Sequence, residues 1–329
     1  MKTKLGVDLG QSGVKLVGEA GMVQFSSMAA LIGNTSVDAP MPGRRVKRPM
    51  IVSGEKIGEM FVGHGAHRWG VPVENFDFSR LAGVTPEMHA IFYGALTEYQ
   101  RKYGRFEDVV EVVIGLPIQM LTGDNKEKYV RQVKGWVGGE HHWMANGDNF
   151  GAIITQVGLL PQATGAVVDY AFDMQGNAIS EEHNKALTKE NATLWIGSST
   201  VELQVTQREE DTKRFNGGAP LGVRWLHNQV DPNGLYSFGE FDEMVRTNDL
   251  PDGMDIQPFL SPWSTQIFGF TSRKWNEAYQ RFYRIFVGGG GSIPLKNELL
   301  AHFNGKIIFA SDPIMSIARG LYKAALRVK

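Results

Sequence analysis

Residues 5–18 read LGVDLGQSGVKLVG, and this stretch decides the fold of the chain. Two short runs, 5–9 and 14–17, carry valine and leucine in the pattern of half-buried β-strands. Between them lies a polar turn that consists of Gly10, Gln11, Ser12 and Gly13. The pattern predicts a β-hairpin, because glycine and small polar residues supply the backbone conformations that a tight turn needs.

The turn of this hairpin has the chemistry of a phosphate-binding loop. A tight turn directs several backbone N–H groups into one concavity, where a phosphate can accept hydrogen bonds from all of them. Lys15 follows the turn and can neutralise phosphate charge, while Asp8 precedes it and can hold the water ligands of Mg²⁺. An ordinary edge hairpin with a polar tip remains an alternative on this stretch alone, since short glycine motifs are common.

Length and composition bound the class of protein. The 329 residues suggest two domains, and two lobes would enclose a cleft. The formal net charge of −1 gives no general field that would attract nucleic acid, so direct nucleic-acid binding is not expected. Without cysteine the chain has no disulfide, thiolate metal site or thiol nucleophile. No run of about 18 apolar residues and no signal-peptide pattern occurs, so we expect a soluble cytoplasmic protein without a direct membrane partner.

Further segments alternate between strand and helix patterns. Residues 50–62 predict a second hairpin, and residues 108–117 predict a buried parallel strand that Pro117 ends. Residues 85–103 begin with a Thr-Pro-Glu capping signature and carry apolar residues at helical spacing, which predicts an amphipathic helix. Residues 161–172 predict another helix with proline at its first position. Its glycine and alanine content would let it pack closely between two lobes.

Two other polar groups have a structural interpretation that we favour. The loop at 34–49 is predicted to be a solvated loop rather than a contact site for a polyanion, although it carries Arg44, Arg45, Lys47 and Arg48. His141 and His142 are adjacent, so on a strand they would point to opposite faces. Chelation of one metal ion by this pair is therefore not expected.

Two later stretches complete the pattern. Residues 192–205 repeat the strand-turn-strand order, with a turn that consists of Gly197, Ser198, Ser199 and Thr200. One such turn in each half of the chain predicts two phosphate-binding loops that face each other across a cleft. Residues 284–294 run from a hydrophobic strand into Gly288, Gly289, Gly290 and Gly291. Without side chains, these glycines would let a sugar or flat ring lie directly on the backbone, so this segment is predicted to bind adenosine.

In this order the motifs resemble those of the actin-like ATPases, within the superfamily of actin, heat-shock chaperones and sugar kinases. Within these ATPases, the motifs resemble the plasmid-segregation type called ParM or StbA, together with its archaeal relatives. The resemblance spans nearly the whole chain. In chain order, the matching segments are the first phosphate loop at 8–15, the strand ending in Gly-Leu-Pro at 113–117, the connecting helix with its catalytic Gln or Glu at 161–166, the second phosphate loop at 196–200, the adenosine loop at 287–292 and the last helix at 312–321.

The resemblance implies an α/β protein with a two-lobed, actin-like (ribonuclease-H-like) ATPase fold. Each lobe would hold a mixed five-stranded sheet with flanking helices, and a nucleotide cleft would separate the lobes. The implied boundaries are 1–160 for the first lobe, 161–310 for the second, and 311–329 for a helix that packs back on the first lobe. The implied ligands are ATP or ADP with Mg²⁺, with Asp8 holding the metal through water and Gln162 orienting the attacking water.

The implied function is that of a cytoskeletal ATPase. Such a protein polymerises with itself into filaments when it binds ATP, and it hydrolyses the nucleotide to control disassembly. The resemblance further implies a role in plasmid or DNA segregation, with a DNA-bound adaptor protein as a possible partner. Two alternatives stay open: a sugar or metabolite kinase of the same superfamily, and a nucleotide-gated scaffold with little turnover.

One position departs from the family pattern. Where the second phosphate loop of the family usually begins Asp-x-Gly, this chain has Trp195-Ile-Gly197. An indole can only donate a hydrogen bond, so we expect either slow hydrolysis or a rearranged site. A purely structural interpretation is that Trp195 packs within its strand. Glu202 stands where the family has a second acidic residue, and it is not expected to substitute for the missing aspartate.

Overall fold

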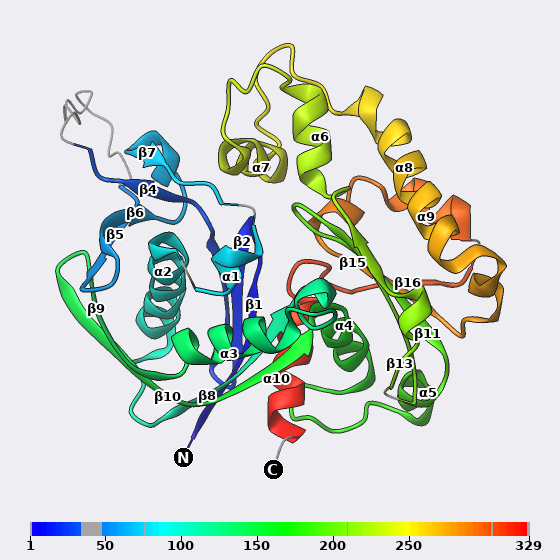
Figure 1. Cartoon of the computed structure of the whole chain (residues 1–329), viewed down its shortest axis with the longest axis horizontal. Coiled ribbons are helices and arrows are strands. Elements are labelled where there is room, and N and C mark those ends of the chain that lie inside the picture. Colours follow the sequence, from blue (N-terminus) through cyan, green and yellow to red (C-terminus); the bar gives the residue numbers. More distant parts are fainter. Residues whose placement is uncertain are drawn as a thin grey trace.

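The chain folds into two lobes, each built on one β-sheet with helices packed against it (Figure 1). The computed structural model describes residues 2–33, 48–75, 77–83, 85–208, 210–303 and 305–327. Most of the loop predicted at 34–49, including Arg44, Arg45 and Lys47, lies outside these residues. Figure 1 has the first lobe on the left, in blue to green, and the second lobe on the right, in green to orange.

The sheet of the first lobe has the strand order β3-β2-β1-β8-β10-β9-β5-β6-β4-β7. The predicted hairpins are confirmed as the antiparallel pairs β1–β2 and β5–β6, and the predicted buried strand is confirmed as β8, which runs parallel to both β1 and β10. The strands span Thr3–Leu9 (β1), Gly13–Gly18 (β2), Gly21–Ser26 (β3), Ala29–Leu31 (β4), Met50–Gly54 (β5), Gly58–Val62 (β6), Val71–Pro72 (β7), Val110–Leu116 (β8), Gly139–Ala145 (β9) and Asp148–Pro161 (β10).

This sheet is larger than the predicted five strands because β10 is 14 residues long. Its first half pairs antiparallel with β9, and its second half pairs parallel with β8. The register shifts between Ile154 and Gln156, where the two halves meet. The mixed five-stranded part, β3-β2-β1-β8-β10, is therefore continuous with a second set of strands from β9 to β7.

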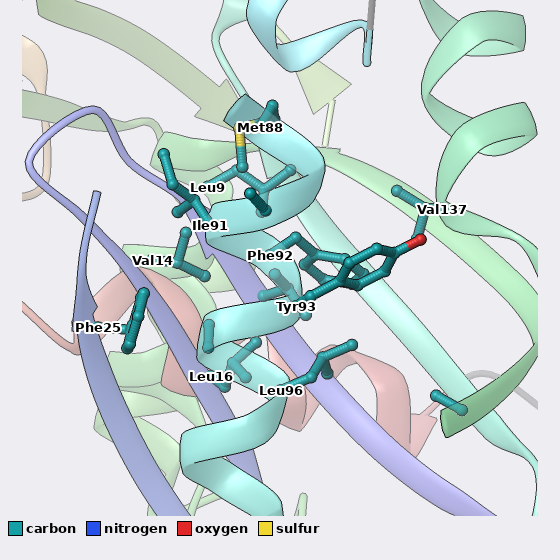
Figure 2. Close-up of a cluster of buried hydrophobic side chains, with 14 of the residues drawn as sticks. Leu9, Val14, Leu16, Phe25, Met88, Ile91, Phe92, Tyr93, Leu96 and Val137 are labelled. Carbon is teal, nitrogen blue, oxygen red and sulfur yellow. The ribbon is translucent and has the colours of Figure 1, made fainter. Parts of the chain in front are cut away.

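The helix α2 (Pro86–Tyr103) covers one face of this sheet and fills its core (Figure 2). It begins at the predicted proline and ends before Gly104, but the Thr85 hydroxyl makes no capping hydrogen bond. The apolar residues predicted at helical spacing are all buried: Met88, Ile91, Phe92, Ala95, Leu96 and Tyr99. Each large side chain buried in this way stabilises the lobe by about 1.5–3 kcal/mol. The other helices here are α1 (Phe78–Leu81) and α3 (Lys126–Val137).

The second lobe is built on a six-stranded sheet in the order β13-β12-β11-β15-β16, with β14 paired to β12. Its hydrophobic core includes Trp263, Phe241 and Leu226, which are fully buried on three different helices. The strands are Asn191–Ile196 (β11), Val201–Gln207 (β12), Glu210–Asp211 (β13), Gly217–Ala219 (β14), Ile285–Gly288 (β15) and Ile307–Phe309 (β16), and the helices are α5 (Glu181–Thr188), α6 (Val223–Val230), α7 (Phe238–Thr247), α8 (Gln257–Trp275) and α9 (Lys296–Phe303).

Two helices, α4 (Gln162–Ala171) and α10 (Ser316–Arg327), cross between the sheets (Figure 1). Their backbones touch at two glycines, since a Cβ atom on Gly320 would lie 1.8 Å from the carbonyl oxygen of Gly165. Asp169 of α4 then accepts hydrogen bonds from Arg319 and Lys323 of α10, both at 2.6 Å. The predicted two-lobed α/β architecture is confirmed, while the exact domain boundaries stay predictions.

None of the helices in the described part of the chain has the length and apolar character needed to cross a bilayer.

Because α4 and α10 cross so closely, one added methyl group at the crossing is predicted to destabilise the fold. We expect Gly320→Ala to lower the free energy of unfolding by about 1–3 kcal/mol, because the methyl group would collide with backbone that cannot easily move. Thermal unfolding followed by circular dichroism measures the loss. The matched control is Gly135→Ala on the exposed side of α3, where a Cβ atom meets nothing within 4 Å. It should leave stability unchanged or slightly higher, since alanine favours a helix over glycine. Equal effects of the two changes would contradict the close crossing.

Candidate functional site

The first polar turn, between β1 and β2, is held in a tight and crowded conformation. A Cβ atom on Gly10 would lie 2.7 Å from both the Gly13 carbonyl oxygen and the Lys15 ammonium nitrogen, so only glycine fits there. The Ser27 hydroxyl donates to the Gly10 carbonyl oxygen at 2.8 Å. Asp8 and Lys15 are direct cross-strand neighbours, and the Lys15 ammonium lies 3.3 Å from the Asp8 carboxylate. A buried carboxylate and a half-buried ammonium group therefore lie side by side next to the turn.

The second polar turn, between β11 and β12, faces the first. Its own conformation is closed by the Gly197 N–H, which donates to the Thr200 carbonyl oxygen at 2.9 Å. The hydroxyls of Ser12 and Ser198 are hydrogen-bonded to each other, and the Ser199 hydroxyl donates to the side-chain carbonyl of Gln11. The predicted arrangement of two turns facing each other is thus observed in the structure, with contacts from both lobes.

Gln162 joins the first turn from the start of α4. Its side-chain amide donates to the Asp8 carboxylate at 2.7 Å. The helix begins at Gln162 because Pro161 ends β10 and has the backbone angles of an N-cap residue. The two residues predicted to be catalytic, Asp8 and Gln162, are therefore in direct contact.

These elements line a cleft between the lobes with a cavity volume of about 160 Å³. A pocket of this kind, with polar groups converging on one end, is typical of small-molecule sites. The predicted site residues that line it are Asp8, Gly10, Gln11, Ser12, Lys15, Gln162, Gly197, Ser198, Ser199, Thr200, Gly289 and Gly290. Three others do not line it: Gly13, Gly288 and Gly291.

At the three predicted glycines that do not line the cleft, close packing leaves little or no room for a side chain. A Cβ atom on Gly288 would lie 2.2 Å from the Trp195 ring, and one on Gly291 would lie 2.4 Å from the Ile196 side chain. A Cβ atom on Gly13 would meet the Phe25 carbonyl oxygen at 3.0 Å. The glycine run after β15 therefore serves two needs, since it lets β11 pack closely and leaves Gly289 and Gly290 at the cleft.

The other end of the cleft has an apolar wall that our sequence analysis missed. It comes from three helices of the second lobe and the segment after the glycine run, through Val223, Leu226, Val245, Trp263 and Ile293. The Trp263 indole is fixed because its N–H donates to the Leu221 carbonyl oxygen at 2.7 Å. Only the helical spacing of these residues could have indicated the wall, and that spacing equally describes an ordinary core.

Trp195 lies at the floor of the cleft, at the end of β11. Its side chain is buried against Val113 of the first lobe, Ala166 of α4 and Ile317 of α10. The structural interpretation, packing within the strand, therefore describes its position, although the residue also borders the cleft.

Glu202 is a second acidic residue at the cleft that our sequence analysis set aside. It lies on β12 directly opposite Trp195 in the strand register. Only 2% of the residue is exposed, and among the described residues neither carboxylate oxygen makes a well-formed hydrogen bond. Burial is the main cause that raises the pKa of Glu202 to about 8; the charge of Asp8 adds to the rise, and the backbone N–H of Ile118 opposes it.

Polar contacts close the mouth of the cleft between the segment 64–74 of the first lobe and α7 of the second. Each is a single polar contact, so together they leave the lobes free to respond to a ligand. They are His64 Nδ1 with Glu243 Oε2 at 3.1 Å, His67 Nδ1 with Ser237 Oγ at 2.7 Å, and the Gly239 N–H with Glu74 Oε1 at 2.9 Å.

The carboxylate of Asp8 fits a magnesium ion that arrives bound to a nucleotide. In the described part of the chain, no group of three or more histidine, aspartate or glutamate residues could hold a metal by itself. Asp8, a carboxylate at the end of the phosphate-type turns, could hold such an ion through water. Mg²⁺ prefers this arrangement, with few carboxylates and several phosphate and water oxygens.

Comparisons with known proteins agree with this geometry. Residues 6–165 match the family model of the actin-like proteins N-terminal domain. The archaeal actin homolog Ta0583 in complex with ADP superposes with a TM-score of 0.73 at 17% identity, covering 100% of both chains. A 15-stranded ParM filament from Clostridium botulinum gives 0.76 at 17% identity over 99% of both, and the apo psk41 parM protein gives 0.70 at 14% identity over 98% of this chain and 96% of that one. No curated protein matches the sequence.

The two lobes with facing polar turns and the likeness to these solved structures show an actin-like fold, which confirms the predicted fold class. ParM proteins share this fold, and the resemblance to actin-like proteins that the sequence motifs predicted is confirmed.

The buried Glu202 carboxyl predicts a pH-dependent stability. Because its pKa in the folded chain, about 8, lies above the ordinary value of 4.5, its contribution is complete below pH 4.5 and is lost as the pH rises toward 8. We expect Glu202→Gln to unfold near the wild-type temperature at pH 5 and several degrees higher at pH 8.5. Thermal unfolding at both values measures the difference. The control Glu210→Gln, at an exposed site on β13, should follow the wild type throughout. A Glu202→Gln curve parallel to the wild type would contradict the burial of an unpaired carboxyl.

Proposed function

We propose that this protein binds Mg²⁺-ATP in the cleft, polymerises into filaments in the ATP-bound form, and hydrolyses the nucleotide to control disassembly. The observation that carries the proposal is the pair of facing turns, whose hydroxyls meet across the cleft at Ser12 and Ser198. The relatives add support, because solved structures of the same fold include an ADP complex and a ParM filament. We further propose a cytoplasmic role in plasmid or DNA segregation, with a DNA-bound adaptor as partner.

Each site residue then has a chemical role. Lys15 and the N–H groups of the two turns bind the phosphates, and Asp8 holds the water ligands of the metal. Gln162 is uncharged and orients the attacking water, which its contact with Asp8 supports. Gly289 and Gly290 let the ribose and base approach the backbone beside the apolar wall. Phosphoryl transfer to water needs mostly this kind of positioning and charge neutralisation.

Assembly follows from closure of the lobes. ATP favours a closed form only by contacting both turns at once, since a ligand shifts an equilibrium only through differential contacts. Closure fixes the angle between the lobes. When that angle brings two different surface patches of neighbouring subunits into contact, the head-to-tail interface repeats from subunit to subunit and forms an open filament.

A scaffold with little turnover is the second candidate. Trp195 favours it, because an indole at the floor of the cleft cannot hold a metal-bound water through an accepted hydrogen bond. Nucleotide binding and assembly would then persist without hydrolysis.

Removal of the Lys15 charge tests the binding site. We expect Lys15→Ala to weaken ATP affinity at least tenfold, about 1.4 kcal/mol, because phosphate charge would go unneutralised in a largely buried cleft. Isothermal titration calorimetry gives the dissociation constants. Lys134→Ala, on an exposed turn of α3, is the matched control and should bind as the wild type does. An unchanged constant in Lys15→Ala would refute the role of the first turn.

Sedimentation tests assembly. We expect the wild type to pellet at high speed with Mg²⁺-ATP and to remain in the supernatant without nucleotide. Gly197→Val should stay in the supernatant in both conditions, because a side chain there lies 3.2 Å from the Thr200 carbonyl oxygen and projects at the cleft wall.

Gly135→Val, at an exposed helical site, is the control for this change and should pellet normally. Circular dichroism verifies that both variants fold. A wild type that stays monomeric in ATP well above micromolar concentration would refute filament formation and favour a metabolite kinase.

A further inference from the structure

The attacking water loses a proton during hydrolysis, and none of the residues assigned so far is placed to accept it. The following inference rests on the proposed ATP hydrolysis. Both carboxylate oxygens of Asp8 are engaged, one by the Gln162 amide at 2.7 Å and the other by the Lys15 ammonium at 3.3 Å. The side-chain amide of Gln162 has no basic site at neutral pH. Trp195 can only donate a hydrogen bond.

Glu202 lies on the face of β12 that α4 covers. Side chains alternate along a strand, and its neighbours Val201 and Leu203 point into the core of the second lobe. Gln204, on the same face as Glu202, accepts a hydrogen bond from Thr164 of α4 at 3.2 Å. Thr164 is two residues after Gln162, so this bond holds the start of α4 over β12. Glu202 and Gln162 accordingly line the same cleft.

The Glu202 carboxyl is also without the partners that a buried acid normally has. It is 98% buried, and neither oxygen makes a well-formed hydrogen bond within the described part of the chain. An unpartnered buried carboxyl costs stability, which a ligand or a water in the cleft can offset. The residue opposite it on β11 is Trp195, so Glu202 is the acid that this strand pair brings to the cleft.

We propose that Glu202 is the general base of ATP hydrolysis in this protein. The water held by Gln162 attacks the γ-phosphorus, and its O–H bond breaks as the proton moves to a Glu202 carboxylate oxygen. The bond between the γ-phosphorus and the bridging oxygen breaks, and its electron pair stays on ADP. Glu202 then returns the proton to inorganic phosphate or solvent. Glu202 on β12 lies directly opposite Trp195, which stands on β11 where the family usually has an aspartate.

Burial suits Glu202 to this role. A carboxylate with a raised pKa is a stronger base than an ordinary glutamate once it is ionised. The positive charge of a Mg²⁺ ion held in the cleft would favour the ionised form. A positioned base contributes about 10²–10⁴-fold to rate.

Phosphate release under saturating Mg²⁺-ATP tests the proposal, with the Kd for ADP measured on the same samples. We expect Glu202→Gln to lower turnover at least 100-fold while the Kd for ADP stays within threefold. Glu202→Asp keeps a carboxylate and should recover part of the turnover. Glu210→Gln, the same change at an exposed site on the neighbouring strand β13, should leave both quantities unchanged. Filaments of Glu202→Gln should also persist after a pulse of ATP that wild-type filaments do not survive.

Three outcomes would overturn the proposal, and they can be told apart. If the wild type shows no turnover, both the proposed hydrolysis and the role of Glu202 as its base are refuted. If the wild type hydrolyses ATP and the turnover of Glu202→Gln is within threefold of it, only the role of Glu202 is refuted. Parallel loss of turnover and ADP affinity in both Glu202 variants assigns the residue to ligand binding or packing instead.

Discussion

The crossing of α4 and α10 between the two sheets determines where everything else in the cleft lies. The two backbones touch at Gly165 and Gly320, and the half-buried Asp169 binds two cationic side chains of α10. Because α4 continues directly from β10 and α10 packs on β1, this crossing sets the distance between the first turn and the start of α4. The hydrogen bond between Gln162 and Asp8 depends on that distance. Buried charge networks of this kind, when every member is partnered, fix one arrangement rather than several.

Close packing also explains the unusual floor of the cleft. The large ring of Trp195 fits at the end of β11 only because Gly288 on the adjoining strand has no side chain. The ring contacts Ala166 and Ile317, so it fills the space between the second sheet and the crossing helices. An aspartate at this position would leave that space empty. The acid that faces the cleft is instead Glu202 on the next strand, directly opposite the indole.

At the two turns and at the mouth of the cleft, the lobes meet through contacts that a ligand can shift. The two turns touch through hydroxyl groups, and Asp242 of α7 accepts a hydrogen bond from Ser12 at 2.9 Å. At the mouth, most of the other contacts between lobes join polar side chains that are partly exposed. None of these contacts buries a large apolar area, whereas each lobe has its own hydrophobic core. A ligand that contacts both turns can therefore change the angle between two otherwise rigid bodies.

The sequence by itself determined the local elements and the chemistry of the two turns. Strand alternation, helical spacing and glycine-rich turns are properties of neighbouring residues, so 5–18, 85–103 and 192–205 could be interpreted correctly, and the motif order indicated the fold. Only the tertiary structure decided which groups meet. The contact of Ser12 with Ser198 joins residues 186 positions apart, the burial of Glu202 depends on α4 and Trp195, and the continuous first sheet depends on one long strand. Local periodicity does not encode such pairings, because burial depends on which distant elements the chain brings together.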